Sequence, residues 1–181
     1  MNKASFQKLK ELEPDACKAL YDKYKVFLYS ICRRYASNEG DAQDMMQEGF
    51  MAIFDSIGKY RFQGSFEGYI KRVFINTVLN FVRKNYQQLY KTESWNLVKH
   101  DSEINAAAIS NLSYEELLNH VQRMPEGYRV VFNMYAIDGY KHKEIAKVLG
   151  IKESSSRSQY TRAKQILQKK IFESENININ E

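Results

Sequence analysis

The chain has 181 residues, of which 44% are hydrophobic and 27% charged, with only 8 glycines and 2 prolines. This length allows one or two small domains, and the scarcity of glycine and proline argues against a β-rich or disordered protein. The formal net charge of +5 is too small to identify a partner, so the local distribution of charge has to do so. Residues 1–14 lack the apolar core of a signal peptide, and no run approaches the roughly 20 apolar residues of a membrane span. We therefore expect a cytoplasmic protein without membrane insertion.

Three helices are predicted in the N-terminal half, and no segment alternates with the period of two that strands require. The first opens at Pro14-Asp15 and ends at residues 37–40, the second runs from about Asp41 to Ile57, and the third from Phe66 to about Lys84. Ser65 is a suitable N-cap for the third helix. Each helix carries an apolar stripe that is expected to be buried. The stripes are Leu20, Tyr21, Tyr24, Phe27, Leu28, Ile31 and Tyr35; Ala42, Met45, Met46, Ile53 and Phe54; and Phe66, Tyr69, Ile70, Val73, Phe74, Thr77 and Phe81.

The C-terminal half is also predicted to be helical. From Asn85 to about Asn111 the apolar pattern dissolves into a polar segment, which indicates a linker. Order returns at Ser113, an N-cap with Glu116 three residues later, followed by helices near Tyr114–Arg123 and Pro125–Ile137. Two further helices meet at Gly150-Ile151 as a helix-turn-helix over residues 139–170. The chain is therefore expected to be all-α, with two small helical domains joined by a flexible linker and a frayed acidic tail.

The last helix is strongly basic. Residues 141–172 contain nine Lys or Arg against two Glu, a charge that suits duplex DNA. Helical spacing turns Ser156, Tyr160, Ala163 and Leu167 toward the first helix of the pair. Ser158, Thr161, Arg162 and Gln165 occupy the opposite arc, where they could reach base edges, and Arg157 and Lys164 suit phosphates. A solvated basic surface helix is the alternative reading.

The helix over residues 66–84 carries a second polar face. Arg72, Asn76 and Arg83 cluster on it, with Lys71, Asn80 and Lys84 at its edges. Basic and amide groups beside aromatic residues suit single-stranded DNA, although most of these aromatics stand at core spacing.

The helix over residues 41–57 has the opposite charge. Residues 36–58 include five acids and no Lys or Arg, and Asp44, Glu48 and Asp55 share one face with Gln47 nearby. A solvated face is the ordinary reading of such acids. In a basic DNA-binding protein, however, this face also suits a basic protein partner.

No catalytic constellation is found. The three histidines are scattered, no glycine loop could cradle a phosphate, and Cys17 and Cys32 lack metal-ligand spacing. Both cysteines fall on one apolar helix face and are expected to be buried, reduced thiols. We predict a protein that is not an enzyme and needs no metal or cofactor.

Two segments resemble a known family. The first, DAQDMMQEGFMAIFDSIGKYRFQGSFEGYIKRVFINTVLNFVRK, resembles the second conserved region of group IV (extracytoplasmic-function, ECF) sigma factors of bacterial RNA polymerase, in the sigma-70 family. The second, MPEGYRVVFNMYAIDGYKHKEIAKVLGIKESSSRSQYTRAKQIL, is similar to their fourth region. The implied layout is region 2 over residues 12–86, a linker over 87–112, region 4 over 113–172 and a tail over 173–181.

The resemblance implies a role for each face. The acidic helix would dock on the β′ clamp helices of core RNA polymerase, and region 4 would meet the β flap. The loop from Tyr60 to Ser65 would shape a pocket for a flipped base, and an anti-sigma factor would hold the protein inactive. The implied site residues are Asp44, Gln47 and Glu48 for polymerase; Arg72, Asn76, Asn80 and Arg83 for the minus-ten element of promoter DNA; and Arg157, Ser158, Thr161, Arg162 and Lys164 for the minus-thirty-five element.

The sequence departs from the family at four helix-turn-helix positions, one of which is Gln159, where the family commonly has Arg. Lysine stands at both expected N-caps, Lys141 and Lys152, where serine is common, and Ser156 stands where the family has an apolar residue. Two other functions were weighed: a stand-alone helix-turn-helix regulator and a non-DNA interaction protein such as a sigma-factor antagonist. Neither accounts for the acidic face and both polar faces together.

Overall fold

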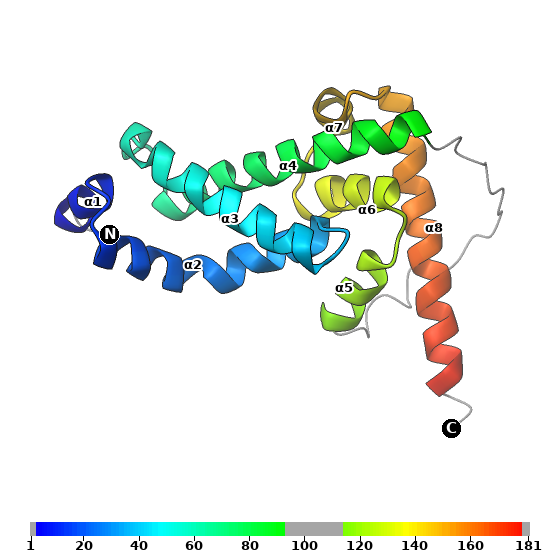
Figure 1. Ribbon diagram of the computed structural model, residues 1–181. Helices are drawn as coiled ribbons and strands as arrows, with labels where there is room; N and C mark the ends of the chain where they lie inside the picture. The colour runs from blue at the N-terminus through cyan, green and yellow to red at the C-terminus, as the bar shows by residue number, and fades with distance from the viewer. Residues whose placement is uncertain (1–2, 93–113, 179–181) are drawn as a thin grey trace. The chain divides into compact units, whose positions relative to one another are not determined.

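The computed structural model describes residues 3–92 and 114–178, and these form helices with no strand among them. The chain divides into two compact units, residues 1–82 and 83–181. Figure 1 shows the described helices coloured in chain order. The predicted all-α class is confirmed. The elements are α1 (Lys3–Lys10), α2 (Pro14–Tyr35), α3 (Glu39–Ser56), a 3₁₀ turn (Ile57–Lys59), α4 (Phe66–Thr92), α5 (Tyr114–Gln122), α6 (Glu126–Phe132), a π-helical turn (Asn133–Ile137), α7 (His142–Leu149) and α8 (Glu153–Asn178).

The helix starts of the N-terminal unit follow from local chemistry. Pro14 opens α2, where a missing N–H is harmless. The Asn38 side chain caps α3 by accepting a hydrogen bond from the Asp41 N–H at 2.8 Å. Ser65 caps α4 as predicted, because its Oγ accepts from the Gly68 N–H at 3.0 Å.

The core of this unit lies between α2, α3 and α4. The prediction of burial is wrong for two residues of α2, Tyr21 and Phe27, which are exposed. They stand at the edges of the apolar stripe of α2, which is wider than the part of that helix that α3 covers. Their rings therefore lie at the rim of the core, next to solvent. The ring of Tyr21 packs against that of Phe50, with 4.7 Å between the centroids. The buried residues on these helices include Leu20, Leu28, Ile31, Tyr35, Ala42, Met45, Ile53, Ile70, Phe74 and Val78.

Helices α3 and α4 approach closely at Gly49. A Cβ atom placed on Gly49 would stand 2.2 Å from the ring of Phe74, which is itself fully buried. Only glycine fits this crossing, because the Phe74 ring occupies the space of a side chain.

The cysteines of α2 are both free, as predicted. Cys32 is fully buried, and burial raises the pKa of its thiol to about 12, so it stays protonated at neutral pH. Cys17 is only half-buried.

In the C-terminal unit α5, α6 and α7 pack against α8. Gly150 ends α7 in the left-handed conformation at φ 71°, which glycine adopts without steric cost, and the Ile151 N–H returns to the Ala146 carbonyl at 3.1 Å. This turn confirms the predicted helix-turn-helix. The hydrophobic core of the C-terminal unit includes a cluster of buried residues: Val121, Met124, Phe132, Ala163, Leu167 and Ile171.

Several boundaries differ from the sequence-based expectation. Helix α1 was not predicted, α4 continues eight residues beyond Lys84 to Thr92, and α8 continues through most of the expected tail to Asn178. Gln87, Gln88 and Lys91 in the continuation of α4, and Glu173 and Glu175 in that of α8, are good helix formers that form no apolar stripe, so apolar periodicity does not detect them. The expected linker core, residues 93–112, and the Ser113 cap lie outside the described residues.

Candidate functional site

The acidic face of α3 is exposed. Asp44, Gln47 and Glu48 all lie on the solvent side of the helix, while the neighbouring Met45, Met46 and Gly49 are buried. The alternation follows from the helical repeat, which brings positions 44 and 48 to one side a turn apart. All three side chains are therefore at the surface, and their role in binding core polymerase stays a prediction.

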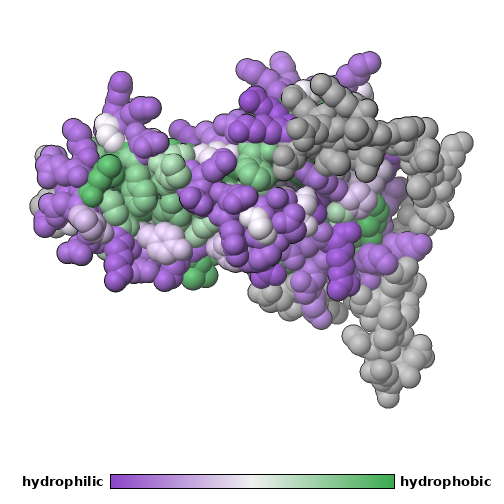
Figure 2. All heavy atoms as spheres, viewed as in Figure 1, coloured by the Kyte–Doolittle hydropathy of each residue, from purple (hydrophilic) through white to green (hydrophobic). Residues whose placement is uncertain are grey.

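An apolar groove of about 680 Å³ runs between α2 and α3 beside this face. Its lining includes Val26, Met51 and the rim residue Tyr21, and Gln47 stands on its wall. Val26 is 77% exposed and Met51 58% exposed. Figure 2 shows apolar area on the surface of the N-terminal unit, amid hydrophilic side chains. Sequence reasoning missed Val26 and Met51; their signal was apolar character away from the core stripes.

The polar face of α4 is also exposed. Arg72, Asn76, Asn80 and Arg83 all lie on the solvent side of this one helix, at steps of four, four and three residues. The intervening core residues, such as Val78, point the other way. The helix therefore presents two cations and two amides along one side, spaced for contacts with a nucleic-acid strand.

The loop before α4 is held from within. Tyr60 is buried, and its hydroxyl donates to the Gly64 carbonyl at 2.8 Å. Tyr69 donates to the Ser56 carbonyl at 2.6 Å. Phe62 lies between these anchors with a positive φ of 57°, and its side chain is exposed. The loop therefore has a defined shape with an aromatic ring at its surface.

Helix α8 has its buried and exposed sides where the helical spacing predicted them. Ser156, Ala163 and Leu167 are buried, whereas the residues predicted to meet DNA are on the other side. Of those, Arg157, Ser158, Thr161 and Lys164 are exposed and Arg162 is half-buried.

Several of these exposed groups are engaged within the helix. The Arg157 guanidinium pairs with Glu153 at 2.6 Å. The Ser158 hydroxyl donates to the Ser155 carbonyl at 3.0 Å, and the Thr161 hydroxyl donates to the Arg157 carbonyl at 3.1 Å. Because a hydroxyl that donates still accepts, both oxygens remain suited to the amino groups of adenine or cytosine.

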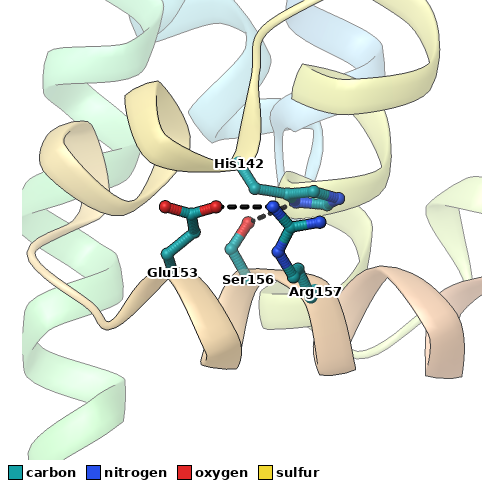
Figure 3. Close-up of polar contacts among 4 residues, drawn as sticks. All are labelled: His142, Glu153, Ser156 and Arg157. Carbon is teal, nitrogen blue, oxygen red and sulfur yellow. Dashed lines mark hydrogen bonds and ion pairs between the residues drawn. The ribbon is translucent and has the colours of Figure 1, made fainter.

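A buried polar pair joins the two helices of the motif. The Nδ1 of His142, on α7, lies 2.9 Å from the Oγ of Ser156, on α8 (Figure 3). The imidazole also stacks on Tyr135 at 4.2 Å between ring centroids. Ser156, where the sequence departs from the expected apolar residue, is therefore matched by a hydrogen-bonding partner across the motif.

The start of α7 is capped in an unusual way. Lys141 is the N-cap residue, and its ammonium cannot accept a hydrogen bond from the backbone. Instead the Glu144 carboxylate accepts from the Lys141 N–H at 2.7 Å, which is one half of a capping box.

Comparison with known proteins identifies these units. The family model of Sigma-70 region 2 matches residues 20–87, and that of Sigma-70 region 4 matches residues 110–167. The chain belongs to the sigma-70 family, in its ECF group. It is a sigma factor that directs transcription initiation, which excludes the stand-alone regulator and the antagonist as readings of the whole chain. Sigma factors are not an enzyme family.

Named relatives share the group at low identity. The ECF sigma factor SigE of Mycolicibacterium smegmatis is 27% identical over 152 residues, which cover 77% of this chain and 55% of SigE. SigW of Bacillus subtilis is 25% identical over 184 residues, covering 94% of this chain and 97% of SigW. Among solved structures, the sigma factor RpoE of Bartonella quintana, in complex with the anti-sigma factor NepR, is 14% identical with a TM-score of 0.47, covering 86% of this chain and 98% of RpoE. None of the sigma factor's described helices is both long enough and apolar enough to span a membrane.

The stability of the sigma factor's region 4 is expected to depend on pH through His142. Burial, and next the charge of Arg157, lower the pKa of His142 below its ordinary 6.5, while Glu153 acts in the opposite direction. The unfolded chain thus binds this proton at a higher pH than the folded protein does. The free energy of unfolding therefore falls as the pH drops below about 6.5, through the window between the two pKa values.

The measurement is hydrogen exchange of the α8 backbone amides between about pH 7.5 and 5.5, compared with His142→Asn. Asparagine keeps a hydrogen-bonding side chain without a proton equilibrium. After correction for the intrinsic exchange rates, the wild-type protein should lose more protection toward low pH than the variant. Parallel losses in the two proteins would contradict the assignment.

Proposed function

We propose that this sigma factor uses three surfaces, one to bind core RNA polymerase and two to bind promoter DNA. The acidic face of α3, with Asp44, Gln47 and Glu48, binds core RNA polymerase. The polar face of α4, with the loop at residues 60–65, opens and reads the minus-ten element. The outer face of α8 reads the minus-thirty-five element. The observation that carries the proposal is that one region exposes both an acidic face on α3 and a face of basic and amide side chains on α4. Carboxylates and DNA phosphates repel each other, so the acidic face is suited to a protein partner and not to DNA.

The remaining assignments complete this proposal. The functional boundaries are residues 12–86 for region 2, 87–112 for the linker, 113–172 for region 4 and 173–181 for the tail. The partners are the β′ clamp helices and β flap of core polymerase, promoter DNA and an anti-sigma factor, in the bacterial cytoplasm. No cofactor is required by this scheme.

The proposal is tested by run-off transcription with purified core polymerase on fragmented genomic DNA. Addition of the protein should produce new transcripts whose start points share two upstream sequence elements. A protein that neither binds core enzyme nor changes the start points would overturn the proposal. A control reaction with core polymerase alone gives the background of non-specific initiation.

Within this scheme, Asn76→Ala should impair promoter opening more than the initial binding of duplex DNA. An amide that contacts a base is typically worth about a fivefold to 150-fold effect, and Asn76 is proposed to meet its base only when the strand is single. The measurement separates closed-complex affinity from the equilibrium of strand opening. Asn119→Ala, the same change at an exposed position of α5, is the matched control. Equal losses in both steps would count against the role of Asn76.

A further inference from the structure

Helix α1 has no role in the functions described so far, yet it packs against the promoter-facing loop. It contacts α2 and the 3₁₀ turn that leads into residues 60–65. Phe6 is its buried residue nearest the loop, at 8% exposure. Its ring lies 4.8 Å from the ring of Phe62 at 64°, 5.8 Å from that of Tyr60, and 6.2 Å from that of Phe66 at 89°. The contacts with Phe62 and Phe66 are edge-to-face, the arrangement that aromatic quadrupoles favour.

Phe62 is held in a conformation that its own chemistry disfavours. A phenylalanine at φ +57° is a backbone outlier, because its Cβ crowds the neighbouring carbonyl. Such a conformation persists only when the surroundings impose it, and it is concentrated at functional sites. Here the surroundings are the rings of Phe6 and Tyr60, the latter 5.1 Å from Phe62.

The ring of Phe62 is therefore packed against other rings on one side and remains exposed to solvent on the other. Phe62 is 53% exposed despite its two ring contacts. Arg61 and Lys59, both exposed, flank it on the same stretch of chain and supply positive charge for a phosphate backbone. A supported ring beside cations is the arrangement on which unpaired bases stack, because every base offers a π-face.

We propose that α1 belongs to the promoter-opening surface, with Phe6 as the positioning residue that holds the exposed ring of Phe62 ready to stack on an unpaired base. The inference rests on the proposed function of region 2. Stacking on Phe62 replaces part of the stacking that a base loses when it leaves the duplex, and this favours strand opening. Phe6 touches no DNA and acts through Phe62.

A purely structural role for Phe6 makes a different prediction. If Phe6 only fills the core, its loss would lower the stability of region 2 without a specific effect on opening. Any apolar side chain of similar size would then replace it. If Phe6 positions Phe62, its effect on opening should depend on the presence of the Phe62 ring and on the aromatic edge of Phe6 itself.

The experiment uses the full-length protein with core polymerase. Open complex formation is followed by the fluorescence of 2-aminopurine in the non-template strand of the minus-ten element. Phe62→Ala should reduce the opening equilibrium by about fivefold to 150-fold, the range of base–aromatic stacking. Phe6→Ala and Phe6→Leu should reduce it in the same direction, whereas binding to core enzyme stays unchanged. The double variant Phe6→Ala/Phe62→Ala should be no worse than Phe62→Ala alone.

Stability is controlled with Leu28→Ala, which removes a fully buried side chain of α2 in the same unit. All variants are assayed below their melting temperatures, where Leu28→Ala should open the promoter normally. Wild-type opening by Phe6→Leu, or independent losses that multiply in the double variant, would overturn the role of Phe6. If the wild-type protein itself opens no promoter with core enzyme, the proposed function fails, and that result is distinguishable from failure of the inference alone.

Discussion

Lysine substitutions at both Asp44 and Glu48 should weaken binding to core RNA polymerase by at least about 100-fold and leave the fold unchanged. Each change replaces a proposed attraction with a repulsion, and like charges facing each other across an interface cost several kcal/mol. A loss of about 2.7 kcal/mol already corresponds to 100-fold. Both side chains are exposed on α3, so the lysines would not be buried. Two lysines one helical turn apart repel each other by only a few tenths of a kcal/mol.

The measurement is the equilibrium affinity for core enzyme, with thermal unfolding as the check on the fold. The double variant Glu11→Lys/Asp15→Lys is the matched control, because it makes the same change in net charge at two exposed positions of the same unit. It should bind core enzyme nearly as well as the wild-type protein. Equal losses for both double variants would show a general effect of charge, and would contradict a specific docking face on α3.

The arrangement of each single helix was predictable because it is local. Helical geometry alone placed Ser156, Ala163 and Leu167 on the buried side of α8, and the structure confirms it. Helical periodicity predicts which side of a helix is buried, but it does not predict how many residues of the apolar stripe are buried. That number depends on how much of the helix surface a neighbouring helix covers. For this reason Tyr21 and Phe27 are exposed where burial was expected.

The features that the sequence did not predict depend on contacts between helices. Ser156 stands where an apolar residue is expected, and only the fold brings its partner His142 beside it. Helix α1 has too short an apolar pattern to be recognised alone, and its importance lies in the contact of Phe6 with the loop. Such pairs follow from helix crossings, which periodicity along one chain segment does not specify.

The crossing of α3 and α4 supports the strongest prediction about stability. Gly49→Ala should lower the free energy of unfolding of the N-terminal unit by about 2–4 kcal/mol, although alanine is ordinarily the better helix former. Its Cβ would stand 2.2 Å from Cε2 of Phe74, with two more ring carbons within 3 Å, and a fully buried ring has no space to withdraw. For a unit of this size the melting temperature should fall by roughly 10–20 °C.

Gly58→Ala is the matched control, because a Cβ there meets nothing closer than the flexible end of Lys10 at 4.0 Å. It should leave the melting temperature within a few degrees of the wild-type value. The decisive variant is Gly49→Ala/Phe74→Leu: if the clash is the cause, the smaller side chain at position 74 should make the Gly49→Ala change cost much less than it does opposite Phe74. If the losses in the free energy of unfolding were instead additive, the clash between position 49 and the Phe74 ring would not be the cause.

Because α3 carries the proposed polymerase face and α4 the proposed promoter face, the same crossing sets the distance between them. The double variant, although folded, should therefore open promoters less well than Phe74→Leu alone if that distance matters to initiation.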